Sequence, residues 1–241
     1  MKQRIIEVCP ALPMFQHFQI HRAQVIVVVD VLRASTTICT AFDHGAKKVI
    51  PVATVEEAMD YQSKGYFVAG ERGGIKLDFA DAGNSPFEMM TDKIKDKTVV
   101  LTTTNGTQAI QMAYGENLTV IGAFINLTIL KNWLLQRSED VLVLCAGWEN
   151  LIGLEDVIFA GALAESLVQE GGFLMNSDET FMAYDLWQLA KYDIHDYISK
   201  FSHTKRLISI GQDESIEYCF KIGVSGSLPF WNNGALKKYI F

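Results

Sequence analysis

The stretch "VIVVVDVLRASTT", residues 25–37, sets the fold class that the rest of the chain extends. Its first five residues are apolar and mostly β-branched, which is typical of a strand buried on both faces of a parallel sheet. Asp30 and Arg33 follow this strand, and three hydroxyl residues, 35–37, come after them. Because burying an unpartnered charge is costly, we expect both charged side chains to lie at the end of the strand, where a ligand can match them.

Similar apolar runs recur along the chain and alternate with segments of helical periodicity. The predicted strands are 25–30, 48–53, 66–69, 98–103, 118–124 and 141–146. In one intervening segment, Thr54 and Glu57 have the spacing of a capping box, and Gly65 is placed to end the helix. Further helices are predicted within 126–138 and 155–172. This alternation predicts an α/β fold: a three-layer sandwich with a mainly parallel sheet and helices on both faces.

The pattern changes from about residue 174, where the chain becomes more polar and helical. We expect no further strong strand there, only helices that pack on the sheet and a short tail containing "LPFWNNGAL" (228–236). No linker rich in Pro, Gly and Ser marks a boundary. Residues 1–241 are therefore predicted to form a single α/β domain with a more helical C-terminal part.

Composition excludes several classes of protein. The 241 residues are 49% hydrophobic with a net charge of -7, and no basic cluster is longer than a pair, so a nucleic-acid partner is disfavoured. The chain shows neither a signal-peptide pattern nor an apolar run long enough to span a membrane, which predicts a cytoplasmic protein without a membrane partner. The composition excludes neither a monomer nor a homodimer. Free thiols in a reducing compartment are expected for the irregularly spaced Cys9, Cys39, Cys145 and Cys219.

Polar residues follow five of the six predicted strands at the point where each strand ends. In chain order they are Asp30 with Arg33, "GERGG" (70–74), "TTTNGT" (102–107), Asn126 and "CAG" (145–147). The carboxyl ends of parallel strands meet at one edge of a sheet, and ligands bind at that edge. We therefore expect a binding site there.

Residue types at this edge predict a site for a phosphoryl group and Mg²⁺. "RASTT" (33–37) and "TTNGT" (103–107) each place hydroxyl residues where a strand gives way to a helix, so N–H groups and hydroxyls can surround an anion. Arg33 and Arg72 can add bidentate contacts to phosphate oxygens. Hard oxygen ligands, which suit Mg²⁺ better than Zn²⁺, are offered by Asp30, Glu71, Glu155 and Asp156.

Each of these residues also has a purely structural interpretation. Ser35 and Thr104 can act as helix caps, and Arg33 can be an ion-pair partner of Asp30. The acidic pair that opens the predicted 155–172 helix is stabilised at a helix N-terminus without any function. Surface or packing positions are expected for the five histidines, which lack metal-ligand spacing: His17, His21, His44, His195 and His203.

Familiar phosphate-handling signatures are absent. There is no Walker A loop and no dinucleotide-binding G-x-G-x-x-G after the first strand. The cysteine-phosphatase spacing fails at Cys145, because Leu151 stands where the arginine is needed. The aspartyl-phosphatase D-x-D pattern fails because Leu32 takes the place of the second acid.

The chain does resemble the 2-phosphosulfolactate phosphatases, a family of magnesium-dependent acid phosphatases with an α/β fold. The resemblance rests on ordered motifs that cover nearly the whole chain: "VDVLRASTT" (29–37), "GERGG" (70–74), "GNSP" (83–86), "TTNGT" (103–107), "CAG" (145–147), "EDVIFAG" (155–161) and "SHTKRLISIG" (202–211). It implies hydrolysis of the phosphate ester of a small sulfonated hydroxy acid to sulfolactate, a step associated with coenzyme M synthesis.

The resemblance also implies a set of site residues. Asp30 either ligates Mg²⁺ or attacks phosphorus, Arg33 and Arg72 neutralise the phosphoryl group, and Glu71 and Asp156 complete the metal site. Substrate contacts are implied for Ser35, Thr36, Asn84, Ser85, Thr104, Asn105, Gly106 and Thr107. One departure is Ser215, which precedes Ile216 where the family more typically has an acid before the aliphatic residue. A related phosphate ester as substrate, a non-catalytic phospho-ligand binder and a phosphotransferase remain alternatives.

Overall fold

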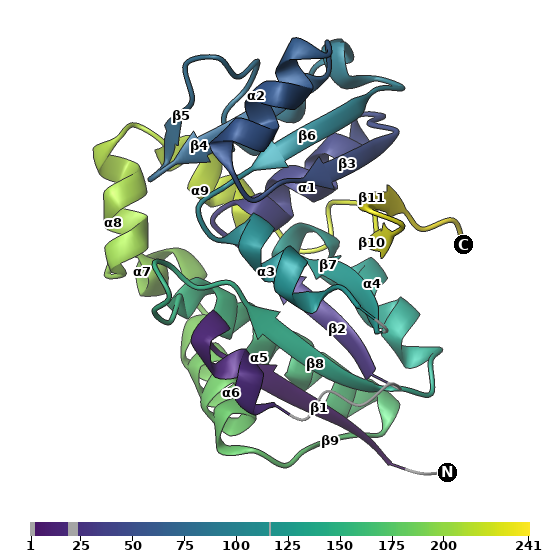
Figure 1. The fold of residues 1–241 in the computed structure, drawn as a ribbon. Coiled ribbons are helices and arrows are strands. Elements are labelled where there is room, and N and C mark those ends of the chain that lie inside the picture. The colour runs from purple at the N-terminus through teal and green to yellow at the C-terminus, as the bar shows by residue number, and fades with distance from the viewer. Residues whose placement is uncertain (1–2, 19–23, 116) are drawn as a thin grey trace.

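A computed structural model of the chain describes residues 3–18, 24–115 and 117–241. Its strands form one sheet in the order β5-β4-β6-β3-β11-β10-β7-β2-β8-β1-β9 (Figure 1). The pairs on either side of the central hairpin are parallel, apart from β4 with β5, and helices cover both faces. The predicted α/β sandwich is confirmed.

All six predicted strands are present, with ends that shift by a few residues. They are β2 (Gln24–Val29), β3 (Lys48–Pro51), β4 (Phe67–Arg72), β6 (Thr98–Thr102), β7 (Leu118–Gly122) and β8 (Asp140–Cys145). Alternate residues of β2 explain its apolar sequence. Val25, Val27 and Val29 enter the core on one face of the sheet, while Ile26 and Val28 enter the core on the other. A strand buried on both faces has no polar alternation, as the valine run indicated.

Five strands were not predicted: β1 (Arg4–Cys9), β5 (Ile75–Lys76), β9 (Phe173–Met175), β10 (Pro229–Asn232) and β11 (Ala235–Lys238). The expectation of no further strong strand after residue 174 is therefore wrong. β10 and β11 form a hairpin whose turn has positive φ angles at Asn233 and Gly234. It lies between β3 and β7 and joins the two parallel halves of the sheet (Figure 1).

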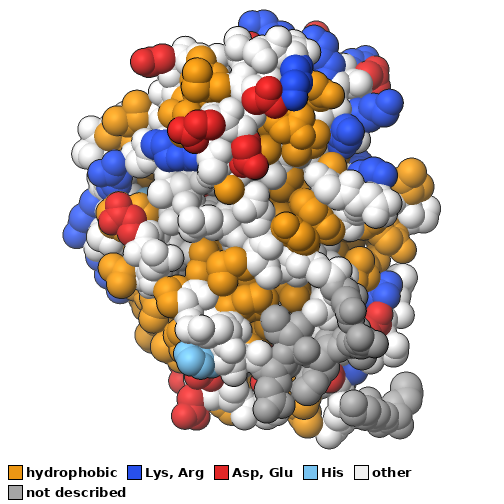
Figure 2. Space-filling model, in the orientation of Figure 1, with side chains coloured by type: hydrophobic (Ala, Val, Ile, Leu, Met, Phe, Trp, Pro, Cys, Tyr) orange, Lys and Arg blue, Asp and Glu red, His pale blue; other side chains and the backbone are white. Residues whose placement is uncertain are grey.

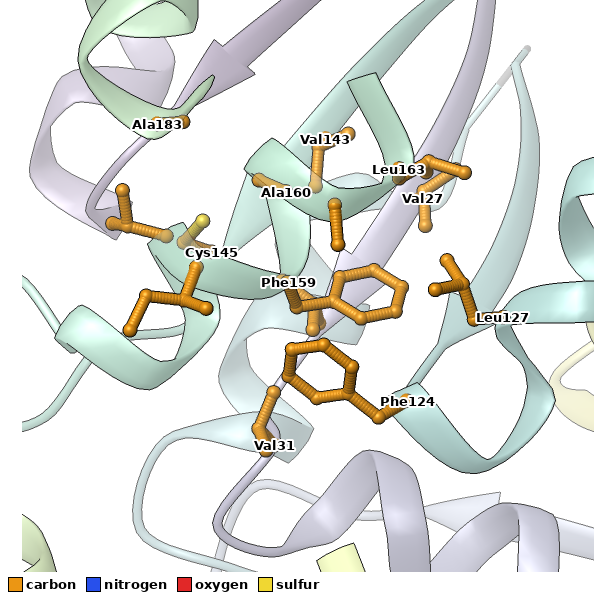
Figure 3. Packing of buried hydrophobic residues seen from close by; sticks show 14 of the residues in the cluster. Val27, Val31, Phe124, Leu127, Val143, Cys145, Phe159, Ala160, Leu163 and Ala183 are labelled. Atoms are coloured by element: carbon orange, nitrogen blue, oxygen red, sulfur yellow. The ribbon is translucent and has the colours of Figure 1, made fainter. Parts of the chain in front are cut away.

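Helices divide between the two faces. One core cluster packs β2 and β8 against α4 (Leu127–Leu135), α5 (Leu154–Gly171) and α6 (Asp178–Ala190). In the middle of it, the Phe124 and Phe159 rings meet edge to face at 5.4 Å (Figure 3). The other cluster contains α1 (Ala34–Asp43) and α3 (Gly106–Ala113). Large apolar side chains thus fix α1, α3 and α5, whose N-termini face the same edge of the sheet.

Shorter elements complete the chain. The predicted capping box starts α2 (Val55–Ser63), with Thr54 and Glu57 as its two partners, and Gly65 follows the helix with φ of 81°. The 3₁₀ turns are η1 (Leu12–His17), η2 (Pro86–Met89), η3 (Asp92–Ile94) and η4 (Phe124–Asn126). Three short helices lie beyond the carboxyl ends of the strands: α7 (Ile194–Ser199), α8 (Ser202–Ser209) and α9 (Asp213–Cys219) (Figure 1).

The edge of the sheet at which the parallel strands begin carries basic side chains near the starts of β3 and β6. Figure 2 shows Lys and Arg side chains gathered there, and Lys47, Lys93, Lys95 and Lys97 are exposed on these segments.

Within the described ranges, no helix is long and apolar enough to cross a lipid bilayer. His21 lies outside the described residues, and the four cysteines are buried free thiols.

Candidate active site

A small pocket lies at the carboxyl ends of the parallel strands. Six residues of the predicted site line it: Asp30, Arg33, Glu71, Asn84, Thr104 and Asn105. They come from the ends of β2, β4 and β6 and from the loop before η2, so the edge that the sequence indicated does hold a site. The pocket is small, with a cavity volume of about 30 Å³.

Asp30 is buried where β2 gives way to α1. Its backbone N–H donates to Ser35 Oγ at 2.8 Å, and its Oδ1 accepts from the Ala34 N–H at 3.2 Å. Gly106 packs directly on the carboxylate, because a Cβ there would lie 2.6 Å from Asp30 Oδ2 and 2.4 Å from Ala34 Cβ. Burial raises the pKa of Asp30 to about 7, although the nearby His203 lowers it. A carboxyl with this pKa changes its charge at neutral pH.

Arg33 precedes α1 and is 3% exposed. Its Nη1 donates to Gln212 Oε1 and, at 3.2 Å, to Ser215 Oγ, both near the start of α9. No ion pair joins it to Asp30 or to another acid in the described ranges, so the ion-pair interpretation is wrong. Burial lowers its pKa from the ordinary value. The neutral Ser215 therefore leaves the charge of Arg33 without a carboxylate partner.

Glu71 links the turn after β4 to the loop after β6. Its Oε1 accepts from the Thr104 N–H at 2.8 Å, and its Oε2 accepts from the Gly74 N–H at 2.6 Å. The Thr104 hydroxyl is also within 3.2 Å of both carboxylate oxygens and accepts from the Gly73 N–H. Asn84 is the neighbouring amide, and its Oδ1 is buried without a hydrogen-bond partner among the described residues. That amide can bond to a bound ligand.

Two residues of the predicted catalytic and metal set do not line the pocket. Arg72 donates to Ala53 O at 3.2 Å and to Thr102 Oγ1 at 2.9 Å, which fixes it between strands. Asp156 accepts from the Val31 N–H at 2.7 Å and the Gly147 N–H at 2.9 Å, so both of its oxygens hold strand ends together. Burial raises the pKa of Asp156 well above its ordinary value.

Five predicted substrate contacts also lie behind or beside the pocket wall. Ser35 bonds to the Asp30 backbone, Thr36 donates to Val31 O, and Thr107 exchanges hydrogen bonds with Thr103. The first turn of α1 and the first turn of α3 are thereby fixed. Ser85 forms a capping box at η2 and lines a separate surface groove. Gly106 supplies the close contact with Asp30.

Among the wall residues that were not predicted are Trp148, His203 and Arg206. His203 Nδ1 lies 2.7 Å from Glu155 Oε1, and its ring stacks on Trp148 with centroids 5.5 Å apart. Burial lowers the pKa of His203, but the Glu155 contact outweighs it and the net pKa is raised. His203 is thus a packing residue, as predicted, but it packs in the wall of the pocket. Its spacing from Arg206 on one face of α8 was the available signal.

Comparison with known proteins decides the family. A family model described as 2-phosphosulpholactate phosphatase matches residues 13–234. A relative from Thermotoga maritima is 38% identical over 208 residues, which cover 86% of this chain and 89% of that protein. Relatives from Caldanaerobacter subterraneus subsp. tengcongensis and Clostridium beijerinckii are each 32% identical, over 88% and 89% of this chain and 89% and 92% of their own. All three are named probable 2-phosphosulfolactate phosphatases.

The chain belongs to the 2-phosphosulfolactate phosphatase family. The motifs that indicated this family converge in the fold: the first, second, third and fourth contribute residues around the pocket, and the last supplies α8. The fifth and sixth meet through the hydrogen bond from Gly147 to Asp156. Positions that line the pocket and positions that support its wall therefore share the same family motifs.

The acids of this phosphatase family member fit a metal ion only in part. Within residues 3–18, 24–115 and 117–241, no group of three or more His, Cys, Asp or Glu side chains is arranged to hold one. Asp30 and Glu71 share the pocket, whereas Asp156 is held outside it by two backbone N–H groups. Mg²⁺ commonly takes one or two carboxylates together with substrate phosphate oxygens and water. Asp30 and Glu71 match that pattern, and the three-acid set does not.

Proposed function

We propose that this chain is a magnesium-dependent phosphatase that hydrolyses 2-phosphosulfolactate to sulfolactate and inorganic phosphate. Family membership supports the reaction. The observation in the molecule that supports it best is the pocket that combines Asp30, Arg33 and Glu71 beside the start of α1. It brings an acid and a cation together within one small volume, as transfer of a phosphoryl group to water requires.

Arg33 is the group suited to the phosphoryl charge. Its guanidinium is anchored through Nη1 by Gln212 and Ser215, while the described residues make no hydrogen bond to Nη2. A pre-oriented guanidinium stabilises charge in the transition state without reorganising. The Thr104 hydroxyl, which also lines the pocket, can add a hydrogen bond to the anion. Asn84 also lines the pocket, where its Nδ2 can donate to an ester oxygen and its unpaired Oδ1 is an oxygen ligand suited to Mg²⁺.

Asp30 has two roles to choose between. As a nucleophile, its carboxylate would attack phosphorus, and the bond from phosphorus to the ester oxygen would break as that oxygen takes a proton from water. The hydroxide left by that water would then attack the acyl phosphate, releasing phosphate and restoring the carboxylate. As a metal ligand, it would share Mg²⁺ with Glu71, and the ion would neutralise phosphate oxygens when bound. Only the deprotonated carboxylate serves either role, which connects its raised pKa to turnover.

Phosphate release separates this proposal from its alternatives. The purified chain is incubated with Mg²⁺ and 2-phosphosulfolactate, phospholactate or simple alkyl phosphates, with EDTA and Asp30→Asn as controls. We expect phosphate release from 2-phosphosulfolactate that EDTA abolishes. Mass spectrometry of acid-quenched enzyme tests for phospho-Asp30. Binding without turnover would make the chain a phospho-ligand binder, and transfer to an acceptor other than water would make it a phosphotransferase.

We also propose the cellular location and the partners of this reaction. Turnover of a free metabolite ester needs neither a nucleic acid nor a membrane as partner, and it suits the cytoplasm and a step towards coenzyme M. Size-exclusion chromatography with light scattering would decide between monomer and homodimer.

A further inference from the structure

Three residues of the pocket wall, Trp148, His203 and Arg206, form a group with its own composition. Trp148 comes from the tight turn after β8, where it exchanges backbone hydrogen bonds with Leu151. His203 and Arg206 come from α8. The Trp148 ring stacks on His203, and the Arg206 guanidinium carbon lies 5.8 Å from its centroid. An aromatic ring and two basic side chains therefore form one continuous surface.

Arg206 is the cation of this wall that lacks an acidic partner. In the described part of the chain it makes no ion pair, whereas His203 is paired with Glu155. Its contact is a hydrogen bond from Nη2 to Gly73 O. Gly73 permits this approach, because a Cβ there would lie 2.9 Å from Nη2. A carbonyl leaves the guanidinium charge unneutralised, so an anion entering the pocket would be a better partner.

The chemistry of the substrate supplies such an anion. The following assignment rests on the proposed function: 2-phosphosulfolactate carries a phosphate, a carboxylate and a sulfonate. The proposed function assigns Arg33 to the phosphoryl group. The sulfonate sulfur is four bonds from phosphorus and the carboxylate carbon is three, so the sulfonate reaches farther across the pocket. Its oxygens can accept two parallel N–H bonds from a guanidinium.

We propose that Arg206, held against the face of Trp148, binds the sulfonate of the substrate and sets the preference for sulfonated esters. When substrate enters, its guanidinium exchanges Gly73 O for sulfonate oxygens. The alternative is that Arg206 only ties α8 to the turn after β4. A purely structural hydrogen bond would stabilise the fold without distinguishing one phosphate ester from another. An experiment can therefore separate the two interpretations.

The test compares Arg206→Gln with Lys205→Gln. Lys205 is the exposed neighbour on α8, so its variant removes the same charge from the same helix outside the pocket. For each protein, kcat/KM is measured with 2-phosphosulfolactate and with phospholactate, which has a methyl group in place of the sulfonated carbon. Thermal midpoints and circular dichroism check folding. Arg206→Lys keeps the charge but loses the fork geometry.

Arg206→Gln is expected to lower the ratio of the two kcat/KM values on the order of 100-fold, chiefly through KM, as the loss of two charge-assisted hydrogen bonds predicts. Arg206→Lys should recover part of this ratio, and Lys205→Gln should keep the wild-type ratio. An equal fall with both substrates would overturn the assignment, since the residue would then serve the phosphoryl group, the carboxylate or the fold. An unchanged ratio would overturn it as well.

A binding measurement keeps this result distinct from failure of the proposed function. If the wild-type protein hydrolyses neither ester, calorimetry with sulfolactate and lactate still tests the subsite. The assignment requires sulfolactate to bind the wild-type protein more tightly than lactate does, and Arg206→Gln to remove that difference. Equal binding of the two acids to the wild-type protein would refute it.

Discussion

Asp30→Asn should stabilise the metal-free protein while abolishing its turnover. Burial raises the pKa of this carboxyl from 3.8 to about 7, which at 1.36 kcal/mol for each pKa unit corresponds to about 4 kcal/mol of folding free energy lost above pH 7. The folded state binds the proton more tightly than the unfolded state does, so this loss grows as pH rises from about 4 to about 7. Asparagine keeps the shape and the acceptor for Ala34 but carries no charge.

The assay is urea unfolding in EDTA at pH 5 and pH 8. The gain in unfolding free energy should approach about 4 kcal/mol at pH 8 and shrink to about 1.6 kcal/mol at pH 5. In thermal unfolding, each kcal/mol corresponds to roughly 2–4 °C for a chain of this size. Asp185→Asn, on the exposed side of α6, removes the same charge as a control. A gain that is equal at both pH values, or absent at pH 8, would refute the argument from burial.

Three further changes test the site's construction. Gly106→Ala should destabilise the fold by about 1–3 kcal/mol, because its Cβ would meet atoms at 2.4 and 2.6 Å. The control is Gly115→Ala, whose Cβ would have no atom within 4 Å and which should stay near wild type in thermal unfolding. Glu155→Gln should lower the pKa of His203, measured by NMR titration of its ring; an unchanged pKa would contradict the pairing. Arg72→Met should lower stability by about 1–3 kcal/mol and kcat/KM by less than tenfold; large activity loss at full stability would restore its predicted catalytic role.

The parallel part of the fold was predictable because its signals are local. Six apolar runs and the capping box at Thr54 each reflect a few adjacent residues. The missed hairpin also had a local signal, since "NNG" at 232–234 is a turn sequence, but its strands are four residues each and their pairing with β3 and β7 is remote in sequence. Two short strands gain their stability from the sheet that they complete, and no window of sequence contains that sheet.

The same contrast between local and remote signals separates the site residues that were predicted correctly from those that were not. The predicted strand ends placed Asp30, Arg33 and Glu71 correctly at one edge of the sheet, because parallel topology brings the carboxyl ends of these strands together. Whether a polar side chain faces the pocket or the backbone behind it depends on rotamer and packing, which is why Arg72 and Asp156 were placed with the pocket residues although both bond elsewhere. The α8 residues were missed because only tertiary docking carries that helix over the strand ends.

Hydrolysis of 2-phosphosulfolactate at the Asp30 pocket can be tested by a single kinetic comparison. Steady-state phosphate release from 2-phosphosulfolactate is measured with Mg²⁺ for the wild-type protein and for Asp30→Asn, whose folding is verified at the same pH. We expect turnover by the wild-type protein and a fall in kcat of at least about 1000-fold in the variant. Full activity of a folded Asp30→Asn, or no phosphate release by the wild-type protein, would contradict it.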